Sequence, residues 1–323
     1  MKIGIIGTGI IVERMIESMK DVDDVSLEAL YSRTLETAED FCKKFAITEA
    51  FDSIDVMLSE SDIDAVYIAS PNSLHYEHAR KCLESGKHVF VEKPLFGNVE
   101  RAKEIFALAQ SKHCFIFETI YNIYLPNFKI LQSKLKEIGP LNLVECNFSK
   151  KSSRYDDLLN GKLPNVFNPT FSGGALADLN IYNIHALVKL LGIPNSSYYD
   201  AILHENGIDL TGVATLRYEN CLAVAIASKQ SGDSNYAKFQ GLNGYINVMG
   251  GLNRIESIEV NVGGNVGSFD VQDKSHMSYQ FNEFISLINA SDYDALNESM
   301  AHSLNVINLA CELRKQVGLD FEY

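Results

Sequence analysis

The sequence predicts an α/β protein, with a doubly wound parallel sheet followed by a second α/β domain on an open, mostly antiparallel sheet. Strand-like and helix-like segments alternate as far as Glu118, at the spacing of β-α-β units. Beyond it, candidate strands follow one another, separated by glycines and asparagines. We therefore expect a dinucleotide-binding domain over residues 1–120 and a domain for substrate binding and oligomerisation over residues 121–323.

Hydrophobic periodicity and turn residues predict the individual elements. Strands of the parallel sheet are predicted where apolar, β-branched runs end at a proline or glycine. The helices between these strands are predicted where apolar residues recur three to four positions apart. The predicted strands are 2–6, 25–31, a short one near 50, 65–69, 89–91, 114–118, 141–149, 198–204, 212–218, 222–228, 237–240, 245–249, 255–262 and 268–271. The predicted helices are 11–19, 36–45, 54–59, 73–85, 99–110, 175–191, 277–288 and 296–317, with an irregular loop over 152–169.

Composition excludes several classes of function. The net charge of -14 is spread along the chain, whereas nucleic acids and anionic membranes attract concentrated Lys and Arg. No apolar run approaches the roughly 20 residues that a membrane span needs, and the chain enters a strand without a signal-like segment. We expect a cytoplasmic protein whose partner is a small molecule.

The six cysteines are far apart in the sequence. They form no C-x-x-C pair and no Cys/His spacing that suits zinc. We expect small buried hydrophobic residues in a reducing compartment, and no metal site.

A glycine turn follows the first predicted strand. Gly7, Thr8, Gly9 and Ile10 lie between that apolar run and a predicted helix. This order presents backbone N–H groups at a helix amino terminus to a pyrophosphate. Val12 replaces the third glycine of the usual fingerprint, which serves helix packing, so the turn should still bind a dinucleotide.

The end of the second predicted strand indicates the type of cofactor. About 20 residues after the glycine turn, NAD-selective proteins carry an acid for the ribose hydroxyl. This chain has Ser32 and Arg33 there, directly after Tyr31. A hydroxyl and a guanidinium suit a 2′-phosphate, so we expect NADP in preference to NAD; the alternative is a solvated loop arginine.

The predicted strand 65–69 also ends in polar residues. Ser70, Pro71 and Asn72 follow it, and His75 lies in the next helix. Proline stops the ladder there, and ligands bind at the carboxyl ends of parallel strands. We assign these four residues to the cofactor site.

The stretch 85–95 carries a lysine to the same edge of the sheet. Its apolar core, residues 89–91, leads to Glu92, Lys93 and Pro94. The position makes Lys93 a proton carrier or a substrate clamp, with Glu92 and Lys93 next to the cofactor. The alternative is a lysine that extends into solvent beside an ordinary strand end.

The predicted helix 175–191 carries a second group of polar residues. Asp178, Tyr182, His185 and Lys189 fall on one stripe of an otherwise apolar helix. Such a stripe favours a functional site. The alternative is an acid that favours the helix dipole and two satisfied core residues.

These motifs together resemble the glucose–fructose oxidoreductase/inositol dehydrogenase/rhizopine-catabolism (Gfo/Idh/MocA) family. The resemblance covers nearly the whole chain, and its most specific part is Glu-Lys-Pro. It implies an NAD(P)-dependent oxidoreductase acting on a sugar, polyol or related diol, with a Rossmann domain first. Val12 and Asn180 depart from the family pattern, and we expect Asn180 and the loop 152–169 to shape the substrate site. The motifs are residues 7–9 (Gly-Thr-Gly), 69–75 (Ala-Ser-Pro-Asn-Ser-Leu-His), 86–94 (Gly-Lys-His-Val-Phe-Val-Glu-Lys-Pro) and 173–185.

Hydride transfer to or from a carbinol carbon needs a group that exchanges the hydroxyl proton. We expect Tyr182 to do this, because a nearby ammonium such as that of Lys93 favours the phenolate. Asp178 would orient the substrate or Lys93, and His185 is the reserve candidate. Tyrosine at this position resembles the glucose–fructose oxidoreductase and dihydrodiol dehydrogenase branch, whereas other branches carry histidine.

Two other functions stay open at this point. One is an NAD-dependent glycosidase of the same superfamily, and the other is a non-catalytic NADP-binding sensor. The proton-transfer residues argue against the sensor. The apolar runs 212–216 and 222–227 also predict a homodimer or homotetramer, because both faces of these strands favour burial.

Overall fold

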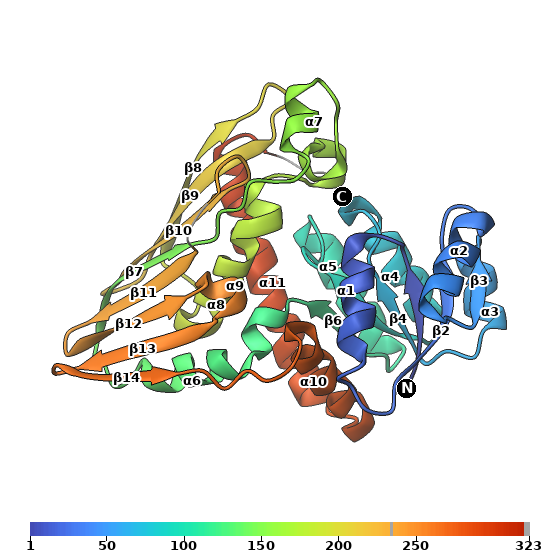
Figure 1. The fold of residues 1–323 in the computed structure, drawn as a ribbon, viewed down its shortest axis with the longest axis horizontal. Coiled ribbons are helices and arrows are strands. Elements are labelled where there is room, and N and C mark those ends of the chain that lie inside the picture. The colour runs from blue at the N-terminus through green and yellow to red at the C-terminus, as the bar shows by residue number, and fades with distance from the viewer. Residues whose placement is uncertain (233–234, 320–323) are drawn as a thin grey trace. The chain divides into compact units, whose positions relative to one another are not determined.

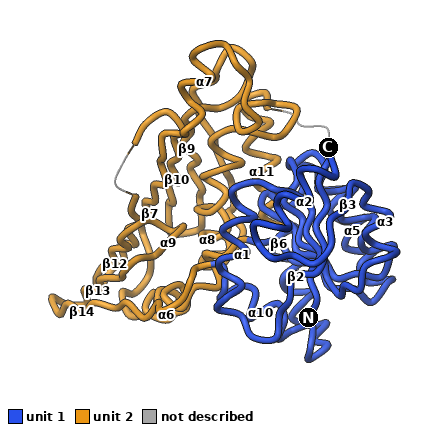
Figure 2. Tube along the Cα trace, turned by 45° about the vertical axis from the view of Figure 1, so that its right-hand side comes forward, with its two compact units in different colours: residues 1–119, 277–304, 323 blue, residues 120–276, 305–322 orange. Residues whose placement is uncertain are grey.

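The structure is a computed structural model that describes residues 1–232 and 235–319. It divides into two compact units, coloured in Figure 2. Of the described residues, unit 1 holds 1–119 and 277–304, and unit 2 holds 120–276 and 305–319. Residues 277–304 thus group with the amino-terminal segment, although the sequence placed them in the second domain.

Unit 1 is built on a six-stranded parallel sheet in the order β3-β2-β1-β4-β5-β6 (Figure 1). The order reverses between β1 and β4, which in doubly wound sheets is where ligands bind beyond the carboxyl ends of the strands. The predicted doubly wound sheet is confirmed. Its strands are β1 (Lys2–Ile6), β2 (Ser26–Tyr31), β3 (Glu49–Phe51), β4 (Ala65–Ile68), β5 (His88–Glu92) and β6 (Ile116–Thr119).

The helices of unit 1 begin at residues suited to the role. The side chains of Thr34, Ser53 and Asn98 accept hydrogen bonds from first-turn N–H groups of α2, α3 and α5, respectively. The helices are α1 (Ile10–Met19), α2 (Leu35–Phe45), α3 (Ile54–Glu60), α4 (His75–Glu84) and α5 (Val99–Ser111), together with α10 (His276–Ala290) from its second residue onward.

Aromatic packing explains why α10 belongs to this unit. The Phe284 ring stacks on Phe117 with centroids 4.3 Å apart and an interplanar angle of 3°. Phe281 packs edge-on against Phe90 at 5.5 Å and against Tyr67 at 6.0 Å. Residues nearly two hundred positions later therefore complete the core of the parallel sheet.

Unit 2 is built on an eight-stranded sheet in the order β14-β13-β12-β11-β7-β10-β9-β8. Every neighbouring pair is antiparallel except β7 and β10, which are parallel, so the predicted mostly antiparallel sheet is confirmed. The strands are β7 (Leu141–Asn147), β8 (Ser196–Leu203), β9 (Asp209–Arg217), β10 (Leu222–Ser228), β11 (Tyr236–Gly241), β12 (Gly244–Met249), β13 (Ser257–Val262) and β14 (Asn265–Phe269).

Several elements of unit 2 differ from the predicted ones. The strand predicted over 255–262 begins two residues later, at Ser257, because the short helix α9 (Gly251–Arg254) precedes it. Helix α6 (Pro126–Lys134) was not predicted, although Pro126 stands at a position that proline favours in a first turn. The loop predicted over 152–169 contains α7 (Tyr155–Leu159).

The two faces of the unit 2 sheet have different environments. Helix α8 (Ile181–Leu191) lies on one face, against which Ala223 and Ala225 are fully buried (Figure 1). The alternate residues Leu222, Val224 and Ile226 point to the opposite face and are partly exposed.

Three absences complete the description of residues 1–232 and 235–319. No helix there combines the length and apolarity of a membrane span. The same residues contain no group of three or more His, Cys, Asp or Glu side chains that could hold a metal ion. All six cysteines are free thiols.

Candidate functional site

The glycine turn after β1 is held between two neighbouring strand ends. Gly7 has a φ of 121°, and a Cβ atom there would lie 2.7 Å from the carbonyl oxygen of Ala69. Its N–H donates to the carbonyl of Tyr31 at 3.2 Å. Both the conformation and the close approach to the end of β4 therefore require glycine.

The turn leaves the start of α1 open. Gly9 is the N-cap of α1 and has no side-chain cap, and a Cβ atom on Gly9 would meet nothing within 4 Å. Ile10 is 68% exposed. First-turn N–H groups have no partner within a helix, so this terminus fits a pyrophosphate. Val12 is fully buried, as its packing role in the fingerprint predicts.

The end of β2 offers a cation beside this turn. Arg33 is exposed, and its guanidinium makes no hydrogen bond or ion pair with any residue of the described chain. Ser32 is buried, and its N–H donates to the carbonyl of Phe51 at 3.0 Å. This arrangement leaves Arg33 available for an anionic group.

The polar residues after β4 divide into exposed and buried ones. Pro71 and Asn72 are partly exposed, as cofactor contacts would be. His75 is fully buried: its Nε2 lies 3.0 Å from the carbonyl oxygen of Ser70 and its Nδ1 lies 3.1 Å from that of Pro94. Burial lowers the pKa of His75, and its ring lies between the loops after β4 and β5, where the neutral form can donate one hydrogen bond to a carbonyl of either loop.

A second histidine of α4 lies close by. His78 Nδ1 is 3.0 Å from Ser70 Oγ, and the His78 ring packs edge-on against Tyr31 at 6.4 Å. Burial, with the charges of neighbouring residues, lowers the pKa of His78 to about 4. This neutral histidine contacts both the end of β2 and a residue after β4, a role that the sequence did not predict.

Glu92 and Lys93 have opposite environments. Glu92 is buried, and its Oε1 accepts hydrogen bonds from Tyr67 Oη at 2.7 Å and Thr119 Oγ1 at 2.8 Å. Burial raises the pKa of Glu92. Lys93 follows the strand and is partly exposed. Glu92 therefore anchors the end of β5 through buried hydrogen bonds, and Lys93 is the partly exposed charged residue at that end.

The segment after Lys93 has a further anchor that was not predicted. The buried carboxylate of Glu118 accepts a hydrogen bond from the N–H of Leu95 at 3.0 Å. Its other oxygen accepts one from Ser303 Oγ at 2.8 Å. Glu118 stands at the end of a buried strand, which is the sequence signal that could have identified it.

In unit 2 the predicted helix 175–191 is not one α-helix. Residues Leu176–Asn180 form a π-helical turn, and the α-helix α8 begins at Ile181. Asp178 lies within the π turn, so it does not continue the regular α-helical stripe of Tyr182. Single π turns are frequent at functional sites.

The residues of α8 lie at different depths. Tyr182 is 7% exposed, and its ring contacts those of Tyr121 at 5.4 Å and Phe148 at 5.7 Å. His185 is fully buried, whereas Lys189 is exposed. Tyr182 is thus nearly buried among aromatic rings, and it lies between the fully buried His185 and the exposed Lys189 in accessibility.

Asn180 does not face a substrate. It is fully buried, and its Nδ2 donates to the carbonyl of Ala225 on β10 at 3.0 Å. Its Oδ1 accepts from Asn183 Nδ2 at 2.9 Å. The expectation that Asn180 contacts the substrate is therefore not supported: the side chain is fully buried, and its amide bonds to one backbone carbonyl and one neighbouring side chain.

The partner of Asp178 was not predicted from the sequence. Lys229 forms an ion pair with Asp178; the lysine side chain is 2% exposed and that of Asp178 is 34% exposed. Lys229 directly follows the apolar strand β10. That pattern, a lysine at the end of a buried strand, had identified Lys93 and was available here too.

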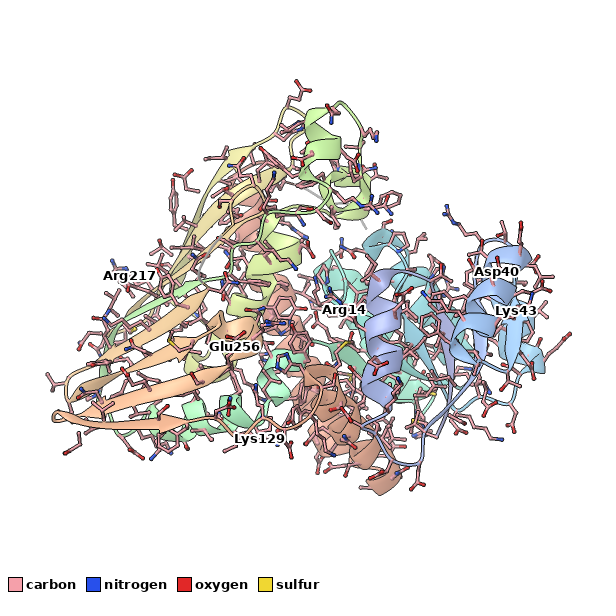
Figure 3. The ribbon with its side chains drawn as sticks, viewed as in Figure 1. Arg14, Asp40, Lys43, Lys129, Arg217 and Glu256 are labelled. Carbon is pink, nitrogen blue, oxygen red and sulfur yellow. The ribbon has the colours of Figure 1, made fainter. Side chains whose placement is uncertain are left out.

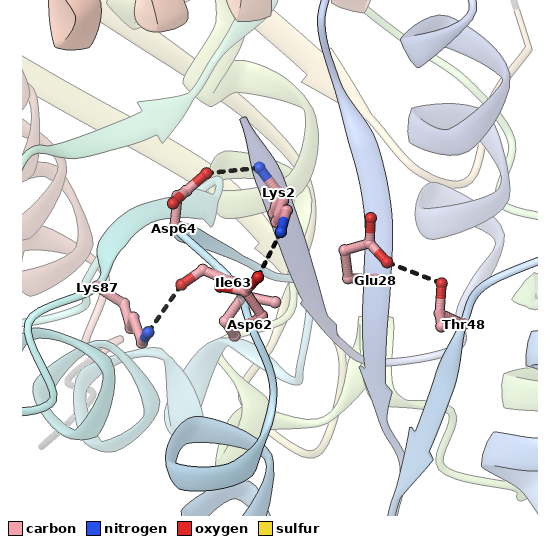
Figure 4. Close-up of polar contacts among 7 residues, drawn as sticks. All are labelled: Lys2, Glu28, Thr48, Asp62, Ile63, Asp64 and Lys87. Atoms are coloured by element: carbon pink, nitrogen blue, oxygen red, sulfur yellow. Dashed lines mark hydrogen bonds and ion pairs between the residues drawn. The ribbon is translucent and has the colours of Figure 1, made fainter.

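Charged residues at the amino ends of the strands of unit 1 have structural partners instead (Figure 4). The N–H of Lys2 donates to Asp64 at 2.8 Å, and its ammonium pairs with Asp62. Lys87 Nζ donates to the carbonyl of Ile63 at 2.7 Å. The residues predicted for the cofactor, by contrast, follow the carboxyl ends of β1, β2, β4 and β5.

Comparisons with known proteins agree with this arrangement. Residues 1–119 match the model of an oxidoreductase family with an NAD-binding Rossmann fold, and residues 133–256 match the Gfo/Idh/MocA C-terminal domain. The chain is 34% identical over 321 residues to scyllo-inositol 2-dehydrogenase (NADP(+)) IolU of Bacillus subtilis (strain 168), covering 99% of this chain and 98% of that protein.

More distant relatives share nearly the whole length. Trans-1,2-dihydrobenzene-1,2-diol dehydrogenase of Xenopus tropicalis is 24% identical over 312 residues, with 92% of each chain covered. The structure of KijD10, a 3-ketoreductase from Actinomadura kijaniata in complex with NADP and TDP-benzene, has a TM-score of 0.86 at 20% identity and covers 98% of this chain and 97% of its own. The chain therefore belongs to the Gfo/Idh/MocA family of oxidoreductases, and its amino-terminal unit is the NAD-binding Rossmann domain of that family.

Proposed function

We propose that the protein is an NADP-dependent dehydrogenase or reductase that interconverts a hydroxyl and a carbonyl group on a sugar, polyol or cyclic diol. The observation that carries the proposal is Lys93, presented at the carboxyl end of β5 on a segment that Glu92, His75 and Glu118 hold from inside. The names of the relatives, an inositol dehydrogenase and a diol dehydrogenase, support the substrate class.

The NADP preference is proposed from Arg33. No described residue occupies its guanidinium, and no acid follows Ser32 to bind a ribose diol. A guanidinium binds a 2′-phosphate through charge-assisted hydrogen bonds. The name of the Bacillus relative includes NADP(+), which supports the same choice.

Substitution of Arg33 tests this preference. We expect Arg33→Ala to raise the NADPH dissociation constant about 10- to 100-fold, because one or two charge-assisted hydrogen bonds are lost. NADH binding should stay nearly unchanged. Fluorescence titration measures both constants. Equal affinity of the unmodified protein for NADH and NADPH would contradict the assignment.

In the proposed reaction a bound nicotinamide supplies or accepts the hydride. Tyr182 exchanges the proton of the reacting oxygen, Lys93 donates a hydrogen bond to that oxygen and favours the phenolate, and Asp178 binds a neighbouring hydroxyl. Tyr182 is preferred to His185 for proton exchange because His185 is fully buried.

A substrate panel tests the function. Inositols, sugars, cyclic diols and the corresponding ketones would be offered with NADP+ or NADPH, and the nicotinamide absorbance followed. We expect turnover with at least one polyol–ketone pair. Release of a sugar from a glycoside without any net change in absorbance would favour the glycosidase. Tight NADPH binding without turnover of any compound would favour a sensor.

A further inference from the structure

A buried lysine lies behind Asp178. The side chain of Lys229 is 2% exposed, and its ammonium pairs with the Asp178 carboxylate. The ammonium also lies 5.3 Å from the centre of the Phe167 ring. A buried ammonium is costly unless it is paired, so the folded protein retains this contact.

The ion pair is open from one side only. The Asp178 side chain is 34% exposed, whereas Lys229 is almost inaccessible. A ligand hydroxyl can therefore donate to the carboxylate, but no ligand reaches the ammonium. Lys229 can therefore act on a ligand only through its neighbours: Asp178, which pairs with its ammonium, and the buried Asp209, whose carboxylate its charge also stabilises.

A second carboxylate holds the same turn by its backbone. Asp209 is buried, and its Oδ2 accepts hydrogen bonds from the N–H of Leu176 at 2.7 Å and from Tyr199 Oη at 2.6 Å. The N–H of Leu176 opens the π turn that carries Asp178. Asp209 thus holds the backbone of the turn, and Lys229 holds its carboxylate.

The backbone of Lys229 has structural contacts as well. Its N–H donates to the carbonyl of Leu210 at 2.8 Å, and its carbonyl accepts from the N–H of Ser152 at 2.8 Å. These contacts do not depend on the side chain. A substitution that keeps the backbone therefore removes the ammonium and leaves the strand end in place.

We propose that Lys229 is a positioning residue that holds the Asp178 carboxylate charged and oriented to accept a hydrogen bond from a substrate hydroxyl. The inference rests on the proposed function, because it needs Asp178 to bind substrate. It also narrows the substrate class: a carboxylate kept in its charged form favours a neutral polyol over a substrate with an acidic group at that position.

A double-mutant cycle tests the proposal, with Lys229→Met, Asp178→Asn and the double variant. The kinetic constants for the compound identified by the substrate panel would be measured with thermal midpoints and NADPH dissociation constants. We expect Lys229→Met to lower kcat/KM about 10- to 100-fold, mainly through KM, as loss of a charge-assisted contact does. In the Asp178→Asn background the same substitution should have no further effect on kcat/KM.

Two controls keep the test decisive. Lys229→Gln, which keeps a donor without the charge, replaces Lys229→Met if the latter does not fold. Lys238→Met removes a lysine from β11 of the same sheet and should leave kcat/KM unchanged. If Lys229→Met lowered kcat/KM equally in the unmodified protein and in the Asp178→Asn background, the proposal would be overturned and the lysine would be merely structural.

The failure of the proposal differs from the failure of the proposed function. If the unmodified protein turns over a polyol and Lys229→Met retains its full kcat/KM, only the positioning role is overturned. If the unmodified protein turns over no compound of the panel, the proposed function is overturned, and the positioning role with it.

Discussion

At the scale of single residues, Lys93 and Tyr182 carry the proposed chemistry. We expect Lys93→Met and Tyr182→Phe each to lower kcat by about 10²- to 10⁴-fold, the usual contribution of general acid–base catalysis. Steady-state kinetics measures the loss, and NADPH titration should show nearly normal binding, since the glycine turn is untouched. The double variant should lose little more than the worse single one, because groups that act in one step are not additive.

The opposite outcomes would be informative. Full activity of Lys93→Met would remove the basis of the mechanism. Full activity of Tyr182→Phe would leave Lys93 as the proton carrier.

The partly buried His78 predicts a pH dependence of stability. Its pKa is about 4 in the folded protein and 6.5 ordinarily, so the unfolded chain binds more protons between these values. The stabilisation from the neutral imidazole is complete above about pH 6.5 and is lost as the pH falls toward 4. Urea unfolding measures the free energy of unfolding at pH 7 and at pH 5. The decrease from pH 7 to pH 5 should be smaller in His78→Gln than in the unmodified protein.

The size of this effect has an upper limit. One proton changes the unfolding free energy by at most about 1.4 kcal/mol per pH unit, and partial exposure of His78 reduces that value. His75 titrates in the same direction because of its burial and remains in the variant, so the pH dependence should be reduced and not abolished. An unchanged difference between the two pH values would contradict the assignment.

At the scale of elements, α10 stabilises the cofactor domain. Phe284 is fully buried and packs against the rings of both Phe90 and Phe117. We expect Phe284→Ala to lower the free energy of unfolding by about 3–5 kcal/mol, the usual cost of removing a buried phenylalanine. Denaturant unfolding measures the change. Leu203→Ala, at a residue that is 41% exposed on β8, should change stability by less than about 0.5 kcal/mol.

At the scale of the whole molecule, the outer face of the unit 2 sheet predicts self-association. Leu222 pairs with Leu143 across the β10–β7 ladder, and Ile226 pairs with Val213 across the β10–β9 ladder. These side chains are partly exposed, whereas Ala223 and Ala225, which alternate with them on β10, are fully buried. Arg217 is on the same outer face at the end of β9 (Figure 3). A second copy of the chain would cover the apolar part of this face.

We expect a homodimer or homotetramer by light scattering at micromolar concentration. Val224→Lys should shift the mass toward the monomer, because it places a charge on a surface that must lose water to associate. Lys43→Ala on α2, labelled in Figure 3, is the matched control and should leave the mass unchanged. A monomeric mass of the unmodified protein would contradict the prediction.

The sequence by itself determined the parallel sheet, its order of elements and the loops expected to meet the cofactor. Strand periodicity, the glycine turn and the proline after Lys93 are local signals, and a residue such as Gly7 carries its own conformational requirement. Such signals can be read from neighbouring residues alone, without knowing which distant residues are in contact.

Only the tertiary structure decided which polar residues face inward. His75, Glu92, Asn180 and His185 looked like site residues in the sequence, yet each is buried. Lys229 and Asp178 are 51 residues apart, and Leu222 on β10 pairs in parallel with Leu143 on β7, still further away in the chain. Local patterns do not contain such pairings, because the partner of a charged side chain is chosen by how the sheet and its helices pack.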